Sequence, residues 1–130
     1  MALRFVPGRG RIVICRFDRG FVPPEMVKTR PFVVIAPRPR STRLVTGVPL
    51  SATPPEPAEP WHHRMSPASY PATRKPLWAK CDMIATVSLD RLDRVKTRDA
   101  DGNRVYRTFV ATQADLDAIA AGVRAHLQRD

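Results

Sequence analysis

The 130-residue chain carries 22 Lys and Arg residues against 12 Asp and Glu residues, a formal net charge of +10, and 43% of its residues are hydrophobic. That content is enough for one modest core, and no stretch approaches the roughly 20 consecutive apolar residues of a membrane-spanning helix. The N-terminal segment MALRFVPGRG lacks the apolar run of a signal peptide. We therefore expect a soluble, cytoplasmic protein whose partner is a polyanion, with nucleic acid as the leading candidate.

The first half of the chain predicts three strands. Apolar, strand-like runs occupy residues 11–17, 31–36 and 44–50. A long connection at 18–29 and a basic turn at 38–43 separate them. The segment TPPEPAEP at 53–60 has four prolines in eight residues, so it cannot form regular structure.

The second half begins with an ambiguous stretch at 61–72, and then residues 77–87 predict a further strand. Ser88 is placed to cap a short helical turn that runs through Leu92. The dipeptide Asp101-Gly102 between two strand-like runs predicts a hairpin over 95–110.

The last segment changes to helical periodicity. Thr112 is a suitable N-cap with Asp115 at the third helical position, and the apolar residues that recur at helical spacing are Leu116, Ile119, Ala120, Val123 and Leu127. Gly122 weakens such a helix by about 1 kcal/mol relative to Ala, so packing against the strands must hold it. Many short strands and one terminal helix predict a mainly β fold, a barrel that the helix covers.

Neither the cysteines nor the histidines predict a metal centre or a cofactor site. Cys15 and Cys81 sit in apolar runs, where a free thiol behaves as a small buried hydrophobe. His62 and His63 are adjacent in a proline-flanked segment, which predicts loop histidines without a third ligand at metal spacing. The neighbouring Trp61 either stacks on a nucleic-acid base or anchors this loop on the barrel.

Four blocks of the sequence, in order, carry a family resemblance. They read PGRGRIVICRFD, KTRPFVVIAP, GVPLSAT and WAKCDMIATVSLDRL, and they cover most of the chain. Together they resemble the conserved blocks of the MazF/PemK/Kid toxins. The resemblance implies an SH3-like small β-barrel of the CcdB/PemK kind with a C-terminal helix, formed as one domain by residues 1–130. It further implies a homodimer, metal-independent and ribosome-independent cleavage of single-stranded RNA, and inhibition by a cognate acidic antitoxin.

The same resemblance nominates catalytic residues. Arg30 matches the family's catalytic arginine, and Ser51 retains the hydroxyl of the usual threonine. Lys80 and Asp82 match a cation and a carboxylate two residues apart, and we therefore expect them on one face of a strand. Asp82 could accept the 2′-OH proton, Arg30 could stabilise the phosphorane, and Ser51 and Lys80 could orient the phosphate. The candidate RNA contacts are Glu25, Lys28, Arg38, Arg40, Arg43, Trp61 and His62.

Three positions depart from the family pattern. Pro24 stands where Kid-like members have a histidine, Arg11 replaces an acidic residue, and Ala85 replaces the arginine before Thr86. A proton-transfer role of the missing histidine cannot operate here. We expect the other two changes to alter the electrostatics near the groove.

Two other classes of function compete with the endoribonuclease. A gyrase inhibitor similar to CcdB shares the barrel, but its toxic determinants lie in a C-terminal tryptophan segment, whereas this chain ends AAGVRAHLQRD. A non-catalytic RNA-binding barrel would need the charge without the converging hydroxyl, carboxylate and arginine. In that case Arg30 is a surface cation, Ser51 a strand-end hydroxyl and Asp82 a salt-bridge partner. A dimer is predicted also because the segment PFVVIA is apolar on both faces.

Overall fold

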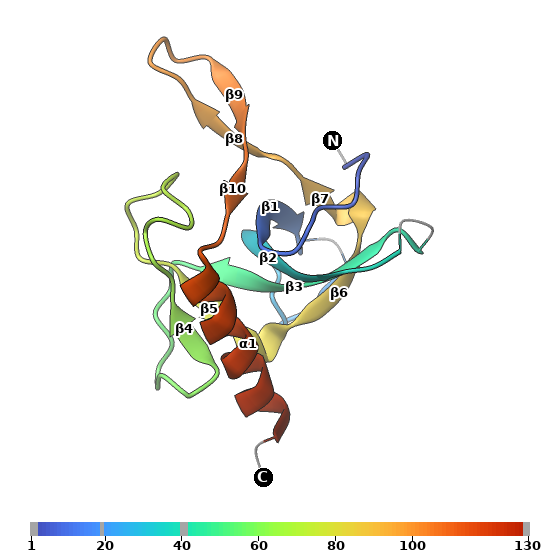
Figure 1. Cartoon of the computed structure of the whole chain (residues 1–130), viewed down its shortest axis with the longest axis vertical. Coiled ribbons are helices and arrows are strands. Elements are labelled where there is room, and N and C mark those ends of the chain that lie inside the picture. Colours follow the sequence, from blue (N-terminus) through green and yellow to red (C-terminus); the bar gives the residue numbers. More distant parts are fainter. Residues whose placement is uncertain (1–2, 19, 40–41, 129–130) are drawn as a thin grey trace.

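The computed structural model describes residues 3–18, 20–39 and 42–128. Ten strands, two 3-10 turns and one helix make up this part of the chain (Figure 1). In chain order they are β1 (Arg11–Arg16), β2 (Thr29–Pro37), β3 (Leu44–Ser51), β4 (His62–Arg64), β5 (Trp78–Lys80), η2 (Cys81–Met83), β6 (Ala85–Ser88), η3 (Leu89–Arg91), β7 (Leu92–Asp93), β8 (Val95–Arg98), β9 (Arg104–Arg107), β10 (Phe109–Val110) and α1 (Gln113–Gln128).

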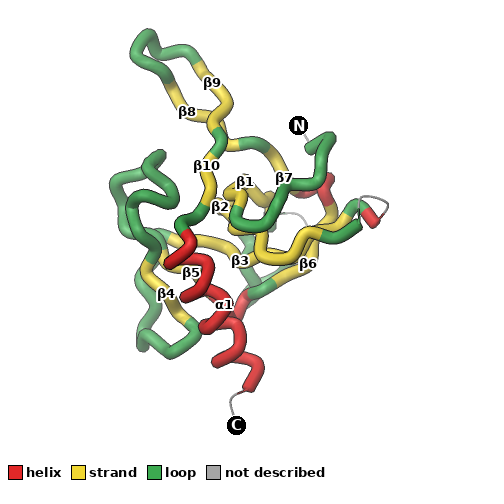
Figure 2. The backbone as a smooth tube through the Cα atoms, viewed as in Figure 1, coloured by secondary structure: helices red, strands yellow, loops and turns green. Residues whose placement is uncertain are grey.

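The main sheet is antiparallel and has the order β10-β1-β2-β3-β5-β4. Strand β6 pairs with β3, β7 pairs with β1, and the β8–β9 hairpin forms a separate two-stranded sheet. Among the described residues, the two edge strands β10 and β4 do not pair, so the ring of hydrogen bonds is not closed. Figure 2 shows the mainly β architecture with helix α1 near the C-terminus, which is the fold class that the sequence predicts.

The central strands are buried on both faces because each face has its own core. Successive side chains of a strand point to opposite faces, so Val33 joins a cluster with Leu116 and Ile119 of the helix, whereas Phe32 and Val34 join a second cluster. The segment 31–36 is therefore largely covered by its own chain. Its two apolar faces do not require a dimer, and that part of the sequence argument was wrong.

The predicted strand at 77–87 is interrupted. It divides into β5 and β6 because the chain turns through η2, where Cys81 is fully buried and donates its backbone N–H to the carbonyl of Trp61 at 3.1 Å. Lys80 and Asp82 consequently do not lie on one face of a single strand, as the sequence suggested. Lys80 ends β5 and Asp82 occupies the turn.

Helix α1 begins as predicted. The hydroxyl of Thr112 accepts the backbone N–H of Asp115 at 3.2 Å, and Leu116 and Ile119 are buried. Leu127, however, is 69% exposed, because the helix extends beyond the sheet at its C-terminus. A Cβ on Gly122 would lie 2.8 Å from the sulfur of Cys81, which explains a glycine in the middle of the helix.

The turns follow their sequence signals in most places. Ser88 caps η3 by accepting the N–H of Asp90 at 3.1 Å, and residues 53–60 contain no strand or helix. The predicted hairpin has a five-residue loop at 99–103. The last pair before this loop joins Arg98 of β8 to Arg104 of β9. None of the described helices is long and apolar enough to cross a membrane.

Both cysteines are free and buried, as predicted. Burial raises the pKa of the Cys15 thiol to about 12, although Arg91 and Arg16 oppose the rise. Burial also raises the pKa of Cys81 to about 12, and the nearby Asp82 carboxylate adds to it. Both sulfurs are therefore held as unreactive thiols at neutral pH.

Candidate active site

The antiparallel sheet brings several candidate residues to one end. Arg30 lies near the start of β2 and Ser51 at the end of β3. Because Phe32 pairs with Pro49, these two strand ends lie at the same end of the sheet. Ser51 is paired with Trp78 of β5, and Lys80 at the end of β5 is paired with His62 of β4.

Arg30 has an unusual environment for a cation. Its side chain is half-buried, and none of the described residues offers its buried Nε a hydrogen-bond partner. A buried N–H donor left without an acceptor costs about 1–3 kcal/mol. The guanidinium thus has unused hydrogen-bonding capacity, which suits it to a phosphate.

Asp82 provides a carboxylate that also has a buried atom without a hydrogen-bond partner in the described part of the chain. Its Oδ1 is buried and receives no hydrogen bond from the described residues, while Nε2 of His62 lies 3.7 Å away. The Nδ1 of His62 accepts the backbone N–H of Glu59 at 3.0 Å, so the neutral ring carries its proton on Nε2. That N–H faces the carboxylate.

Lys80 and Ser51 complete the candidate catalytic set. Burial lowers the pKa of the Lys80 ammonium, and the charge of Asp82 offsets part of this effect. Ser51 is buried, and its hydroxyl oxygen accepts the backbone N–H of Thr53 at 3.2 Å. The hydroxyl hydrogen of Ser51 is therefore the part that can still be donated.

A cavity of about 360 Å³ brings Glu25 and Asp82 to one surface. Pro24 and Ala85, two of the departures from the family pattern, also line it. This groove therefore has neither the histidine nor the arginine that the family pattern would supply. Glu25 has a structural task there, since its carboxylate accepts the backbone N–H of Val22 at 2.7 Å.

The third departure lies elsewhere. Arg11 is at the start of β1, donates to the hydroxyl of Thr108 at 3.4 Å and lies over the ring of Phe5. Arg30 pairs with Cys15, four residues along β1, which corresponds to about 13 Å of strand. Arg11 does not line the groove, contrary to the sequence expectation.

The basic turn is also remote from this end. Arg38 and Arg43 are exposed beyond the end of β2 and before the start of β3, whereas Arg30 and Ser51 lie at the opposite ends of these strands. Arg43 forms an ion pair with Asp90 at 2.8 Å. Arg40 lies outside the described residues. Lys28, exposed and two residues before Arg30, is on the same side as the groove.

The segment predicted to hold loop histidines is the strand β4, so that prediction was wrong. As expected for neighbours in a strand, His62 and His63 have different partners. His62 faces Asp82, and Nε2 of His63 lies 2.8 Å from the carboxylate of Asp115 in helix α1. Trp61 packs against the core and the ring of His126, which supports the anchoring role over base stacking.

Sequence reasoning missed the network around Asp115. Its buried carboxylate accepts hydrogen bonds from His63, from the Ser69 hydroxyl at 2.5 Å and from the Ser66 backbone N–H at 3.0 Å. Burial alone would raise the pKa of Asp115, but these hydrogen bonds outweigh it and hold the pKa below its usual value. The three partners precede Asp115 by 46 to 52 residues, so no local pattern could reveal them.

No group of three or more His, Cys, Asp and Glu residues in the described part of the chain is arranged to hold a metal ion. The family model of the PemK-like, MazF-like toxin of type II toxin-antitoxin systems matches residues 8–126. The chain belongs to this toxin family. The match includes every candidate catalytic residue and all strands and most of the helix.

Solved structures of the toxin family have the same fold. A mycobacterial endoribonuclease in complex with its cognate antitoxin is 20% identical, with a TM-score of 0.62, and the match covers 95% of this chain and 97% of that one. MazF (Form-I) from Deinococcus radiodurans is 14% identical with a TM-score of 0.70, over 96% and 99% of the two chains. The MazE–MazF complex (Form-II) from the same organism is 15% identical with a TM-score of 0.62, over 97% and 99%. No curated protein sequence matches the chain.

Proposed function

We propose that this toxin is an endoribonuclease that cleaves single-stranded RNA through the 2′-hydroxyl of its substrate, without a metal ion. The family match, the structural neighbours described as endoribonucleases and the formal charge of +10 support RNA as the substrate. The observation that carries the proposal is the pair of unsatisfied atoms, Arg30 Nε and Asp82 Oδ1, on groups at one end of the sheet. A phosphodiester would supply an acceptor to the first. The second can receive the Nε2–H of His62, 3.7 Å away, which leaves the other carboxylate oxygen of Asp82 for the 2′-hydroxyl of the substrate.

The proposed reaction is an internal transesterification. Asp82 accepts the proton of the 2′-hydroxyl, the 2′-oxygen bonds to phosphorus, and the bond from phosphorus to the 5′-oxygen breaks. Arg30 stabilises the charge on the non-bridging oxygens. The products are a 2′,3′-cyclic phosphate and a 5′-hydroxyl.

The leaving 5′-oxygen needs a proton, and Lys80 is the best donor among the candidates. A guanidinium holds its protons too tightly to be a good acid. Burial lowers the pKa of the Lys80 ammonium, which makes its proton easier to release. We assign this step to Lys80, with Ser51 as a hydrogen-bond donor to the phosphate.

His62 has a positioning role in this scheme. With its Nδ1 occupied by the Glu59 N–H, it directs its Nε2–H toward Oδ1 of Asp82. This orientation leaves the second carboxylate oxygen of Asp82 to receive the substrate proton. His62 thus acts beside the carboxylate, although it cannot replace the proton transfer of the histidine absent at Pro24.

Two partners belong to the proposal. We expect a homodimer, which would place two cleavage grooves along one face, and a cognate antitoxin whose acidic segment covers Arg30 and competes with RNA. Neighbouring structures of MazF with MazE and of an endoribonuclease with its antitoxin support the second expectation. A monomer mass in light scattering at micromolar concentration would contradict the dimer, and undiminished cleavage beside the co-expressed acidic neighbour would contradict the antitoxin.

The deciding experiment is cleavage of a defined RNA in the presence of EDTA. We expect products with 2′,3′-cyclic phosphate and 5′-hydroxyl ends, and no cleavage of DNA or of RNA with a 2′-deoxy or 2′-methoxy group at the cut site. Such substrates should still bind through their phosphates. Cleavage that needs magnesium and leaves 5′-phosphate ends would overturn the mechanism, and binding without any cleavage would favour an RNA-binding barrel.

A further inference from the structure

The β8–β9 hairpin is separate from the main sheet. Its strands pair with each other and, in the described part of the chain, with no other strand. Figure 1 shows the ribbon projecting from the body, at the end of the molecule opposite to the C-terminus of α1. Val95 at its base is buried in the core. Packing therefore does not explain the residues on its outer part.

One face of this ribbon collects positive charge. The pairs Lys96–Tyr106 and Arg98–Arg104 place four exposed side chains on the same face, because alternate residues of a strand share a face. The guanidinium of Arg94 lies 3.9 Å from the centre of the Tyr106 ring, and the amine of Lys96 lies 5.1 Å from it. Tyr106 remains 46% exposed between these cations.

The two arginines of this face have no carboxylate partner among the described residues, although the Arg98 guanidinium donates to the carbonyl of Gly102 at 2.8 Å. Arg98 and Arg104 stand directly opposite each other, and like charges in that relation destabilise a ribbon. Neither forms an ion pair with a described residue. The nearest carboxylate along the chain, Asp99, is occupied by the turn, where it accepts the N–H groups of Asp101 and Asn103. An external anion between the two arginines would relieve the repulsion.

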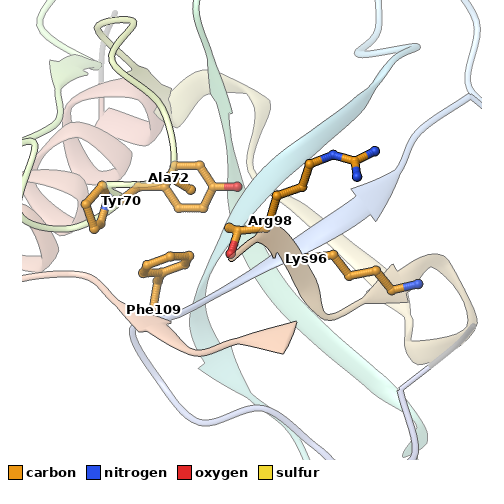
Figure 3. A pocket seen from close by; sticks show the side chains of 7 residues that line it. Tyr70, Ala72, Lys96, Arg98 and Phe109 are labelled. Carbon is orange, nitrogen blue, oxygen red and sulfur yellow. The ribbon is translucent and has the colours of Figure 1, made fainter. Parts of the chain in front are cut away.

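A cavity beside the ribbon does not account for these cations. It has a volume of about 490 Å³ and is lined by Tyr70, Phe109 and parts of Lys96 and Arg98. Figure 3 shows that the charged ends of Lys96 and Arg98 point away from Tyr70 and Phe109. The charges are therefore presented on the outside of the ribbon and not to the cavity.

We propose that this face of the β8–β9 hairpin is a second RNA-binding surface, which holds single-stranded RNA outside the cleavage groove. Phosphates would lie between Arg98 and Arg104, and a base would stack on Tyr106. Cations that flank an exposed aromatic ring match the alternation of phosphate and base in RNA. An acidic polypeptide would use the cations but leave the ring without a role. The identification of RNA as the bound polyanion rests on the proposed function.

The test measures binding with an RNA that cannot be cut. Two fully 2′-methoxy RNAs are titrated with the protein at several salt concentrations. One has about 6 nucleotides, which fit within the span of one small barrel, and the other has about 24 nucleotides. The variants are Arg98→Gln/Arg104→Gln, Tyr106→Ala and Tyr106→Phe. Arg9→Gln/Arg124→Gln, at two exposed arginines outside the hairpin, removes the same net charge and serves as the control. Circular dichroism and the molecular mass confirm that each variant is folded and assembled as the parent is.

For the longer RNA, each lost phosphate contact should lower the slope of log affinity against log salt by about 0.7. The double arginine variant should therefore bind about 25-fold more weakly than the parent at 0.1 M salt, and this difference should vanish on extrapolation to 1 M salt. Tyr106→Ala should weaken binding about fivefold or more at every salt concentration, because stacking is not screened. Tyr106→Phe and the control should bind nearly as the parent does. The short RNA should not distinguish the hairpin variants from the control.

An equal loss in the control and the hairpin variant, or unchanged binding of the longer RNA, would overturn the proposal. Unchanged RNA binding with lost binding of polyglutamate would assign the hairpin to an acidic protein instead. Because the RNA is uncleavable, this result is independent of catalysis. If the toxin cut no RNA and still bound long RNA through the hairpin, only the proposed function would be contradicted.

Discussion

Nε2 of His62 lies 3.7 Å from Oδ1 of Asp82. His62 is in strand β4 and Asp82 in the turn η2, which are distant in sequence and come together in the fold. The imidazole is largely buried, and the backbone N–H of Glu59 fixes which of its nitrogens carries the proton. A donor of fixed direction thus faces the carboxylate that we propose as the base. The distance leaves room for a shift toward a full hydrogen bond when substrate binds.

The relationship predicts a difference between two substitutions of His62. His62→Phe removes the donor and keeps most of the volume, so kcat should fall about tenfold or more with little change in KM, because Asp82 loses its orientation. His62→Gln retains an N–H near the position of Nε2 and should restore most of the rate. Steady-state cleavage of a fluorescent RNA, with melting temperatures as a folding check, measures both. Equal loss in the two variants would indicate a purely structural role.

Arg30 should matter more for the transition state than for binding. Arg30→Ala removes the guanidinium whose Nε has no partner among the described residues, so the cleavage rate should fall by about 10²-fold or more, roughly 3 kcal/mol. Binding of uncleavable RNA should fall far less. Arg30→Lys should recover only part of the rate, since an ammonium loses the two-pronged geometry. Ser51→Thr should remain active. Full activity in Arg30→Ala would exclude the mechanism.

The buried Asp115 network should make stability depend on pH in the acid range. The pKa of Asp115 is lowered in the folded state from an ordinary value of 3.8. Its contribution to stability is therefore fully present above that value and is lost as the pH falls through the lower folded pKa. Asp115→Asn should reduce the free energy of unfolding by about 2–4 kcal/mol at pH 7. Urea unfolding should show this difference narrowing below pH 3.8.

Asp117→Asn is the matched control, because Asp117 is exposed on the same helix and bonds only to Gln113 in the described structure. It should change the free energy of unfolding by less than about 0.5 kcal/mol. A similar loss in both variants, or a loss in Asp115→Asn that persists unchanged in acid, would show that the hydrogen-bonded charge is not the source of the stability.

Most of the fold could be predicted because its signals are local. The apolar runs of β1 to β3, the cap at Thr112 and the turn at Asp101-Gly102 each depend on neighbouring residues. The interruption of the strand at 77–87 could not be predicted in this way. Ala79, Cys81 and Met83 alternate with charged residues as in a half-buried strand. The turn forms because Cys81 is placed under Gly122 of the helix and bonded to Trp61.

The site was predictable only to the extent that family motifs mark its residues. The motifs nominated Arg30, Ser51, Lys80 and Asp82, and strand order accounts for the meeting of Arg30 and Ser51 at one edge. The partnership of His62 with Asp82 arises from the pairing of β4 with β5, two strands separated by 13 residues of loop. Conversely, the sequence marks Arg38 and Arg43 as candidate RNA contacts, but antiparallel pairing places them at the ends of β2 and β3 opposite to Arg30 and Ser51.

At the contact between Gly122 and Cys81, packing opposes helix propensity. An alanine at an ordinary helical glycine stabilises the helix by about 1 kcal/mol. Here the added Cβ would lie 2.8 Å from the Cys81 sulfur and 3.2 Å from its Cβ. Gly122→Ala should therefore destabilise the protein, by about 1–3 kcal/mol, because the helix must move away from a close-packed core. Urea unfolding at neutral pH measures the change.

Two further variants separate the causes. Ala121→Gly at the adjacent exposed position reports the propensity alone and should cost about 1 kcal/mol. Cys81→Ala removes the sulfur, so Gly122→Ala should be neutral or stabilising in that background, with a coupling of about 0.5–3 kcal/mol in the double-mutant cycle. RNA cleavage by Gly122→Ala should fall as well, since displacement of Cys81 also displaces Asp82 in the same turn. If Gly122→Ala stabilised the native protein, the close approach of α1 to η2 would be incorrect, and with it the account of why the strand ends at Lys80.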